Sequence, residues 1–586
     1  MIGDIPRRIT ARRGCSLSYR GKTLLSTIDP ITQAERLVDA VSKLNRTLYF
    51  CVSPLFGYGL EKLLDSISAD SAVLCVETDE ELARLAEEAL TPLLNATDRL
   101  CFTRSADPVH LCALVRSCWG SRRFRRIAML RLSGGWQFDV KTYDALAEVL
   151  RREIAADWGN AITLAKLGRR YISNTLRNLP LLAGAEGIEK LNFGTRPILV
   201  LGAGPSLDGV LDGLEAKFPA RRPFIIVAVD TALGSLKARG IKPDLVVALE
   251  SQHWNLRDFI GLGDWELPLA MDLSALPATG GLKGGKPYIF FTPWAPLRLF
   301  DRLEATGLLP EKIPPLGSVG LSTVFLSLRL GSGPVIIAGI DFSFTVDLFH
   351  ARSSPSHREK LRLQSRLRPL ISGAAAFRKG AGRGLSKSGG TVLTDISLKN
   401  YRDLFEREFA PQGGRLRDIA GSGLKLGVET LSLENALGLL ETGGGGGAQN
   451  SITEPGEKTE AGEGQKPPLP DARPLLPARP LLTARALSAF ILKEQEALEE
   501  LRAMLTGEKV PEAGQTEAQF GERLETLLDE CDYLWAHFPD CAGTEGRRPG
   551  IEDLSFLKRV RVEIDPFLKL WNLARKNLDT PTRSWS

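Results

Sequence analysis

The chain has 586 residues, a length that favours three or four domains rather than one. Its hydrophobic content of 43% and charged content of 25% are those of a globular protein with a sizeable core, and the net charge of only +5 does not indicate nucleic-acid binding. No run of apolar residues is long enough to cross a membrane, and the first residues lack the apolar segment of a signal peptide. The eight cysteines form no CxxC pair. We therefore expect a cytoplasmic protein with reduced thiols and no bound metal.

Residues 1–185 have an α/β pattern. Short apolar runs at Thr47–Val52, Ser71–Val76 and Arg126–Arg131 alternate with helical patterns such as that of Glu80–Leu94. We predict a Rossmann-like α/β domain here.

A glycine turn, Gly57-Tyr58-Gly59, follows the first of these runs, and Glu77 follows the second. A methyltransferase-like nucleotide pocket would use such residues. One glycine turn and one acid favour a purely structural unit instead.

Residues 186–442 form a second predicted α/β domain. Its apolar runs alternate with helical patterns, which indicates a mostly parallel sheet covered on both faces. The predicted strands are Pro197–Leu201, Pro223–Val229, Leu245–Leu249, Leu269–Leu273, Tyr288–Phe291 and Pro334–Gly339. Ligands of such sheets bind at the carboxyl ends of the strands. The candidate ligand-binding residues at those ends are Gly202, Gly204, Asp230, Glu250 and Asp341.

The first strand of this domain ends in a turn typical of an anion site. Gly202 and Gly204 allow close approach of a ligand to the backbone, and Pro205, Ser206 and Leu207 open a helix whose first N–H groups point at the turn. The dinucleotide fingerprint requires Gly where Leu207 stands, and the chain contains no GxxxxGK[S/T] run. The pattern thus predicts a phosphate site that belongs neither to an NAD enzyme nor to a P-loop NTPase.

A second turn of the same kind, Gly317-Ser318-Val319-Gly320, precedes a helix that reaches Leu330. Two such turns in one sheet would hold a diphosphate or a nucleoside monophosphate between them. Residues 352–390 contain ten Lys and Arg against the single acid Glu359, a local charge of +9. This segment either attracts a phosphorylated ligand or is a solvated insertion.

The last part of the chain differs in composition. Residues 443–482 are rich in Gly, Glu, Lys and Pro, and we predict a flexible, disordered linker there. Residues 483–586 are predicted to form a C-terminal helical domain, with helices over Leu487–Leu505 and Phe520–Phe538.

Several motifs of the chain together resemble those of the motility accessory factor family. These are flagellin glycosyltransferases with a 6-hydroxymethylpterin pyrophosphokinase (MptE)-like domain, and the resemblance covers roughly residues 15 to 440. The motifs are Gly202-Ala-Gly-Pro-Ser-Leu207, Val227-Ala-Val-Asp-Thr-Ala-Leu233, Gly317-Ser-Val-Gly320 and Ala338-Gly-Ile-Asp-Phe342. The chain departs from the family pattern at Glu250, where the family has Asp, and at Phe349, which replaces the Thr before His350.

The resemblance implies transfer of a CMP-activated nonulosonic (sialic-acid-like) sugar to a Ser or Thr hydroxyl of flagellin. Gly202, Gly204–Leu207, Asp230, Glu250, Gly317, Ser318 and Gly320 would then bind the nucleotide, without a required cofactor. His350 is the candidate general base, because an imidazole accepts a proton at neutral pH. Asp341 would hold the ligand, bond loop amides or cap the next turn.

Two other functions stay open. A diphosphokinase of the pterin type would need Mg²⁺, which Asp230, Glu250 and Asp341 would hold at successive strand ends. A flagellar assembly or export factor would keep the fold without the catalysis.

Overall fold

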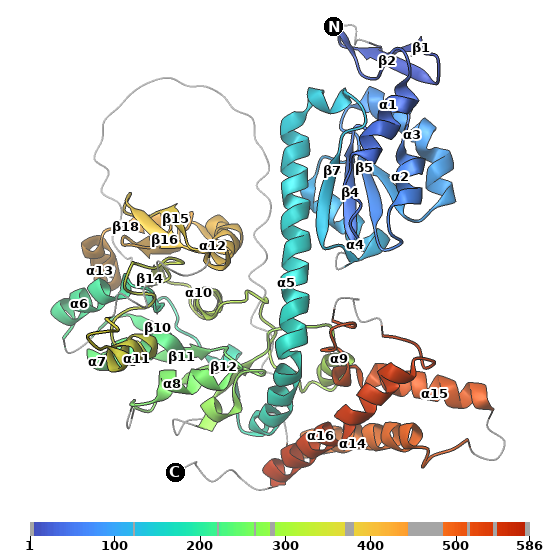
Figure 1. Cartoon of the computed structure of the whole chain (residues 1–586). Coiled ribbons are helices and arrows are strands. Elements are labelled where there is room, and N and C mark those ends of the chain that lie inside the picture. The colour runs from blue at the N-terminus through green and yellow to red at the C-terminus, as the bar shows by residue number, and fades with distance from the viewer. Residues whose placement is uncertain are drawn as a thin grey trace, which may run out of the picture. The chain divides into compact units, whose positions relative to one another are not determined.

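The computed structural model describes residues 5–120, 123–219, 222–262, 265–281, 287–369, 380–442, 484–511, 516–542 and 548–579. They form two compact units (Figure 1). Unit 1 comprises Met1–Arg169 and Asp532–Phe556, and unit 2 comprises Arg170–Cys531 and Leu557–Ser586. The predicted linker at 443–482 lies outside the described residues.

Unit 1 is built on a four-stranded parallel sheet in the order β6-β5-β4-β7, as its apolar runs predict. An antiparallel hairpin sheet, β1-β2-β3, precedes it in the chain. The strands are β1 (Arg7–Thr10), β2 (Cys15–Tyr19), β3 (Lys22–Thr23), β4 (Thr47–Val52), β5 (Ala72–Val76), β6 (Leu100–Thr103) and β7 (Arg126–Leu130). The helices are α1 (Pro30–Asp39), α2 (Leu60–Ser66), α3 (Glu80–Ala96), α4 (Pro108–Trp119) and the long α5 (Val140–Asn178), which continues into unit 2.

Unit 2 contains a nine-stranded sheet in the order β18-β17-β14-β9-β10-β11-β12-β13-β8, and each neighbouring pair is parallel. The strands are β8 (Glu186–Gly187), β9 (Ile198–Leu201), β10 (Ile225–Val229), β11 (Leu245–Ala248), β12 (Leu269–Asp272), β13 (Tyr288–Phe290), β14 (Val335–Ala338), β17 (Leu416–Ile419) and β18 (Glu429–Leu431). A separate antiparallel hairpin pairs β15 (Gly382–Leu385) with β16 (Thr391–Thr394).

The helices of unit 2 lie mostly between these strands in the sequence. They are α6 (Leu207–Lys217), α7 (Leu233–Ala238), α8 (Leu256–Phe259), α9 (Arg298–Ala305), α10 (Val319–Leu330), α11 (Pro355–Leu363), α12 (Ile396–Phe409) and α13 (Leu433–Thr442). Three longer helices follow the undescribed segment: α14 (Ala484–Thr506), α15 (Glu517–Glu530) and α16 (Leu554–Asp579). The helix predicted over 520–538 ends earlier, at Glu530, and a short 3-10 turn follows it. No helix in the described part of the chain has both the length and the hydropathy needed to cross a bilayer.

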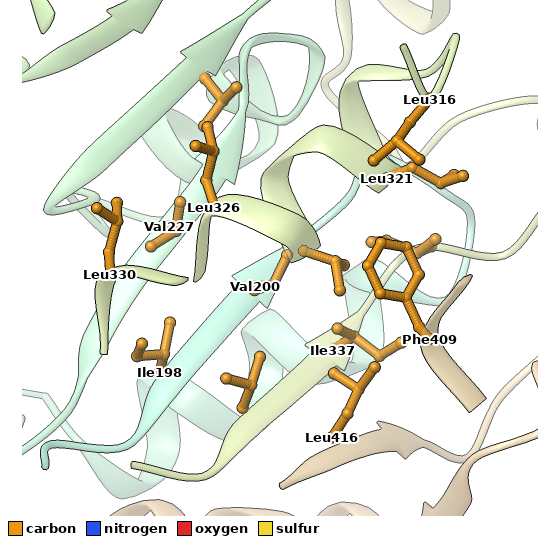
Figure 2. Close-up of a cluster of buried hydrophobic side chains, with 14 of the residues drawn as sticks. Ile198, Val200, Val227, Leu316, Leu321, Leu326, Leu330, Ile337, Phe409 and Leu416 are labelled. Atoms are coloured by element: carbon orange, nitrogen blue, oxygen red, sulfur yellow. The ribbon is translucent and has the colours of Figure 1, made fainter. Parts of the chain in front are cut away.

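The core of unit 2 lies between the central strands and α10. The side chains of β9, β10 and β11 are buried along their whole length, as expected for strands covered on both faces. Figure 2 shows Val200 of β9 and Ile337 of β14 beside Leu321 and Leu326 of α10. Each such side chain contributes about 1.5–3 kcal/mol through burial. This packing fixes α10 against the sheet, with its first turn near the strand ends where the candidate site lies.

The order of the strands reverses between β9 and β14. From β9 the chain proceeds outward through β10, β11, β12 and β13, and it then returns to place β14 on the other side of β9. The connections leave these two strands in opposite directions, and the carboxyl ends at such a reversal are where open α/β sheets bind ligands.

An ion pair joins the C-terminal helices to the rest of unit 2. Arg302 on α9 donates from Nε and Nη2 to the two carboxylate oxygens of Glu494 on α14, at 2.6 and 2.7 Å. Only 4% of the Glu494 side chain is exposed. The carboxylate is therefore almost completely removed from water and depends on this guanidinium.

Replacing Arg302 with Leu should destabilise unit 2 by about 3 kcal/mol, because it leaves a buried carboxylate without its partner. Urea unfolding followed by circular dichroism would measure this loss. Glu496→Gln, an exposed position on the same helix, is the matched control. Equal midpoints for both variants would show that the ion pair contributes little.

Candidate functional site

The turns after β9 and β14 contact each other through their backbones. The Gly202 N–H donates to the Ala338 carbonyl at 2.8 Å, and the Gly204 N–H donates to the Gly339 carbonyl at 2.7 Å. A Cβ at Gly202 would lie 2.4 Å from the Gly339 oxygen. Glycine is thus required at Gly202 because another strand end, and not only a ligand, approaches it.

Asp341 holds the first turn in place. Its Oδ2 accepts from the Ser206 N–H at 2.8 Å and its Oδ1 from the Ser206 hydroxyl at 2.6 Å. The next residue, Phe342, has a left-handed φ of +47°, which is strained for a side chain of that size. Of the roles considered for Asp341, the structure shows hydrogen bonding to the turn.

The amides of the first turn are engaged within the chain. Besides Gly204 and Ser206, the Leu207 N–H donates to the Gly204 carbonyl at 3.0 Å, and Pro205 has no N–H. The Leu207 side chain is buried. The free N–H groups expected over 204–207 are therefore used by the protein itself in this conformation, and nucleotide contact by these residues stays a prediction.

The second turn reaches the same place as the first. Gly317 has a φ of +67°, and Ser318 stands before the first residue of α10. The first hydrogen bond within α10 runs from the Ser322 N–H to the Ser318 carbonyl. The N–H groups of the residues before Ser322 therefore have no acceptor within the helix. A Cβ built at Gly202 or at Gly320 would contact the Ile340 side chain. The two predicted turns thus converge on this one residue.

Lys387 is the residue of this site that sequence reasoning missed. It lies between β15 and β16, and its side chain is fully buried. Its Nζ donates to Asp418 Oδ1 at 2.9 Å and lies 3.7 Å from Asp341 Oδ1. Lys387 belongs by sequence to the basic segment, but in the structure it is an internal counter-ion to two aspartates. The only sequence signal is its place in a Ser-Lys-Ser-Gly-Gly turn.

Asp418 at the end of β17 is the second buried carboxylate of this cluster. Its Oδ2 has no hydrogen-bond partner among the described residues. Burial raises the pKa of Asp418 to about 7, and the Lys387 ammonium opposes this shift. Near neutral pH this carboxyl therefore exchanges a proton, a behaviour that an exposed aspartate does not show.

The loop that carries His350 is attached to the first turn. The Ala351 N–H donates to the Ala203 carbonyl at 2.9 Å, and the Arg352 N–H donates to Asp208 at 3.1 Å. His350 Nδ1 lies 3.2 Å from the Ser356 hydroxyl. Burial, with a smaller effect of Lys360, lowers the pKa of His350 to about 4, so the ring is neutral at physiological pH.

The acids after β10 and β11 lie on the other side of β9 from Asp341. Asp230 accepts from the Thr231 N–H and from the Asn255 amide, both at 2.7 Å. Burial raises the pKa of Asp230 to about 6 and that of the neighbouring Asp258 to about 7. Glu250 accepts from the Gln252 N–H at 2.9 Å. The strand ends hold several carboxylates that are costly to ionise.

The structure does not gather Asp230, Glu250 and Asp341 into one set of ligands. Among the described residues, no three or more His, Cys, Asp or Glu side chains are arranged to hold a metal ion. Both oxygens of Asp341 already accept from Ser206. A magnesium ion at these strand ends would need other oxygen ligands, such as those of a bound phosphate.

The basic segment begins at Arg352 and continues through α11. This helix has no buried residue, and Arg358 and Arg362 are exposed on it. Arg257 on α8 pairs with Glu359 at 2.8 Å, which ties α11 to the domain. Arg378 and Lys379 lie outside the described residues. The described part of the segment therefore presents positive charge next to the His350 loop.

Comparison with known proteins places part of this site in a recognised domain. Residues 173–347 match the 6-hydroxymethylpterin diphosphokinase MptE-like family, and this range includes both turns and Asp341. An uncharacterized protein of Treponema pallidum (strain Nichols) is 30% identical over 592 aligned residues, which cover 98% of this chain and 97% of that protein. The chain thus contains an MptE-like domain, and it belongs to the same family as the Treponema protein.

A solved structure of a Maf glycosyltransferase from Magnetospirillum magneticum AMB-1 is also similar. The sequence identity is 13% and the TM-score is 0.49, with 97% of this chain and 88% of that chain covered.

The stability of unit 2 should depend on pH through Asp418. Its folded-state pKa of about 7 lies above the ordinary value of 3.8, so the folded protein holds this proton more tightly than the unfolded chain. The contribution of Asp418 to stability therefore falls as the pH rises from about 4 to about 7. In Asp418→Asn this fall disappears, and the variant should gain up to about 4 kcal/mol relative to the wild type across that interval.

Urea unfolding at several pH values between 4.5 and 7.5 would measure this difference. Asp403→Asn is the control, because the Asp403 side chain is 48% exposed. If the two variants keep a constant offset from the wild type at every pH, Asp418 does not titrate in this range.

Proposed function

We propose that the protein is a glycosyltransferase that moves a CMP-activated nonulosonic acid onto a Ser or Thr hydroxyl of flagellin. The observation that carries this proposal is the convergence of the Gly202–Leu207 turn, the Gly317–Gly320 turn and the His350 loop at the carboxyl ends of β9 and β14. These are the motifs on which the resemblance to the motility accessory factors rests. The nature of the donor and acceptor follows from that resemblance.

The site has groups suited to the transfer. In the reaction the bond between the sugar carbon and the CMP phosphate oxygen breaks, and CMP leaves with the electron pair. The acceptor hydroxyl forms the new carbon–oxygen bond and gives up its proton. The start of α10 offers N–H groups to the phosphate, and the exposed arginines of α11 attract the acidic donor.

His350 is the proposed acceptor of the hydroxyl proton. With its ring proton on Nδ1, facing the Ser356 hydroxyl, the imidazole presents the lone pair of Nε2. A pKa of about 4 keeps the ring unprotonated at neutral pH, although it also makes it a weaker base than an ordinary histidine.

A second candidate function is diphosphate transfer, and the match of residues 173–347 to the MptE-like diphosphokinase family favours it. This reaction would require Mg²⁺ bound with a nucleoside triphosphate, near Asp230 and Glu250.

Titration calorimetry with CMP, AMP, GMP and UMP, each with and without Mg²⁺, should separate these functions. We expect CMP to bind most tightly and to need no metal. Binding of adenine nucleotides only in the presence of Mg²⁺ would instead support diphosphate transfer. Absence of binding by all four nucleotides would favour an assembly or export factor and overturn the proposal.

Replacing His350 with Gln should lower the rate of transfer by about 10²–10⁴-fold and leave CMP affinity unchanged, because a general base acts on the transition state. Since the base form predominates above a pKa of about 4, the wild-type rate should be level from pH 5 upward and fall below it. Single-turnover rates and calorimetry would measure the two effects separately. His357→Gln is the control from the same loop region, and an equal loss in that variant would indicate damage to the loop instead of removal of a base.

A further inference from the structure

Unit 1 contains a cavity that the proposed glycosyl transfer does not use. It has a volume of about 210 Å³ and lies outside the residues that match the MptE-like family. Its wall includes Arg20, Glu77, Asp79, Phe138, Asp139 and Tyr143. The cavity is smaller than the 300–1,000 Å³ typical of sites for drug-sized ligands. It is therefore suited to a single small ring.

The cavity lies where ligands of parallel sheets bind. In unit 1 the chain runs from β4 to β5 and β6 on one side, and β7 returns to the other side of β4, so the strand order reverses at β4. Glu77 follows β5 directly, and Gly135 lies in the connection after β7. Ser53 directly follows β4, and a Cβ at Gly135 would lie 2.1 Å from the Ser53 hydroxyl oxygen. The connections after β4 and β7 are therefore packed tightly together. Glu77 and Thr78, directly after β5, line the cavity, which therefore lies at the carboxyl end of that strand.

The carboxylates in the wall are held by the chain in fixed positions. Glu77 accepts from the hydroxyls of Ser53 at 2.6 Å and Tyr143 at 3.0 Å, and burial raises its pKa. Asp79 caps α3, and Asp139 accepts from the Thr142 N–H and the Thr78 hydroxyl, each at 3.4 Å. The contacts of Asp139 are long, so its oxygens are the most available to a ligand.

The wall of the cavity also contains a guanidinium donor and an aromatic ring. Arg20 has a left-handed φ of +46° in the turn between β2 and β3, and its guanidinium pairs with Asp79 at 2.9 Å. The same guanidinium lies 4.8 Å from the centre of the Tyr19 ring and 5.5 Å from that of Phe138. Half of the Arg20 side chain is exposed, so it also reaches solvent at the opening.

This set of groups selects for one ligand chemistry. Three carboxylates against one guanidinium repel a phosphate or another anion. Closely spaced acceptors and donors beside an aromatic ring suit vicinal hydroxyls on a compact ring. An acid after the second strand of an α/β unit is also the group that binds ribose hydroxyls in nucleotide sites. We propose that this cavity binds the hydroxyl-bearing ring of a neutral sugar, either the ribose of a nucleoside or a pyranose unit of a glycan.

Saturation-transfer NMR on the full chain would test this proposal, with methyl β-ribofuranoside and methyl glucopyranosides as probes. We expect saturable binding of at least one probe and weaker binding of its 2-deoxy form. A preference for the furanoside would assign the site to a nucleoside, and a preference for a pyranoside would assign it to a glycan. Absence of saturable binding by every probe would overturn the proposal.

Two variants test whether the sugar binds in this cavity or at the site in unit 2. Asp139→Asn keeps the size of the side chain and should weaken binding by about tenfold or more, because a charged acceptor is lost. Phe138→Ala should weaken it as well. Asp144→Asn, at an exposed position on α5 five residues after Asp139, is the matched control and should have no effect.

Unchanged affinity in both Asp139→Asn and Phe138→Ala, with thermal unfolding like that of the control, would show that the sugar binds elsewhere and overturn the assignment. Because the probes lack CMP and the variants lie in unit 1, these outcomes do not depend on whether unit 2 transfers glycosyl groups.

Discussion

The close contact between the turns after β9 and β14 is the constraint on which the candidate site depends. Gly202 and Gly204 allow the two backbones to meet, and Asp341 then reaches across to both polar groups of Ser206. This pair of bonds sets where α6 begins. The position of the His350 loop follows in turn, because Ala351 hydrogen-bonds to the carbonyl of Ala203 in the same turn.

The buried ammonium of Lys387 explains how Asp341 and Asp418 can both be buried near this contact. Asp341 and Asp418 would repel each other in a medium of low dielectric constant, and Lys387 lies within 4 Å of both. Such a buried cluster costs desolvation energy that hydrophobic residues would not, so it is a poor way to gain stability alone. Its effect here is to hold three separate parts of the chain, after β14, at β17 and between β15 and β16, in one geometry.

The central fold could be predicted from the sequence because its strands are apolar throughout. Ile225–Val229 is buried at every position, and such a run has few alternatives to a covered parallel strand. The edge strands β8 and β18 were missed because they are two and three residues long and partly exposed. At the site, the glycine turns have a local signature, whereas His350 was named through the family resemblance, and its role stays a prediction. The role of Lys387 depends on an aspartate 31 residues away, and no local pattern records such a pairing.

The residues after α15 affect when each unit can finish folding during synthesis, because they are divided between the two units. Asp532–Phe556 belong to unit 1, and α14 supplies Glu494 to a pair with Arg302 in unit 2. Neither unit is complete until the residues that follow α15 have been synthesised. During translation both α/β sheets would therefore leave the ribosome before α16, which contributes residues to both units. A premature stop codon anywhere before that helix would leave both units unfinished.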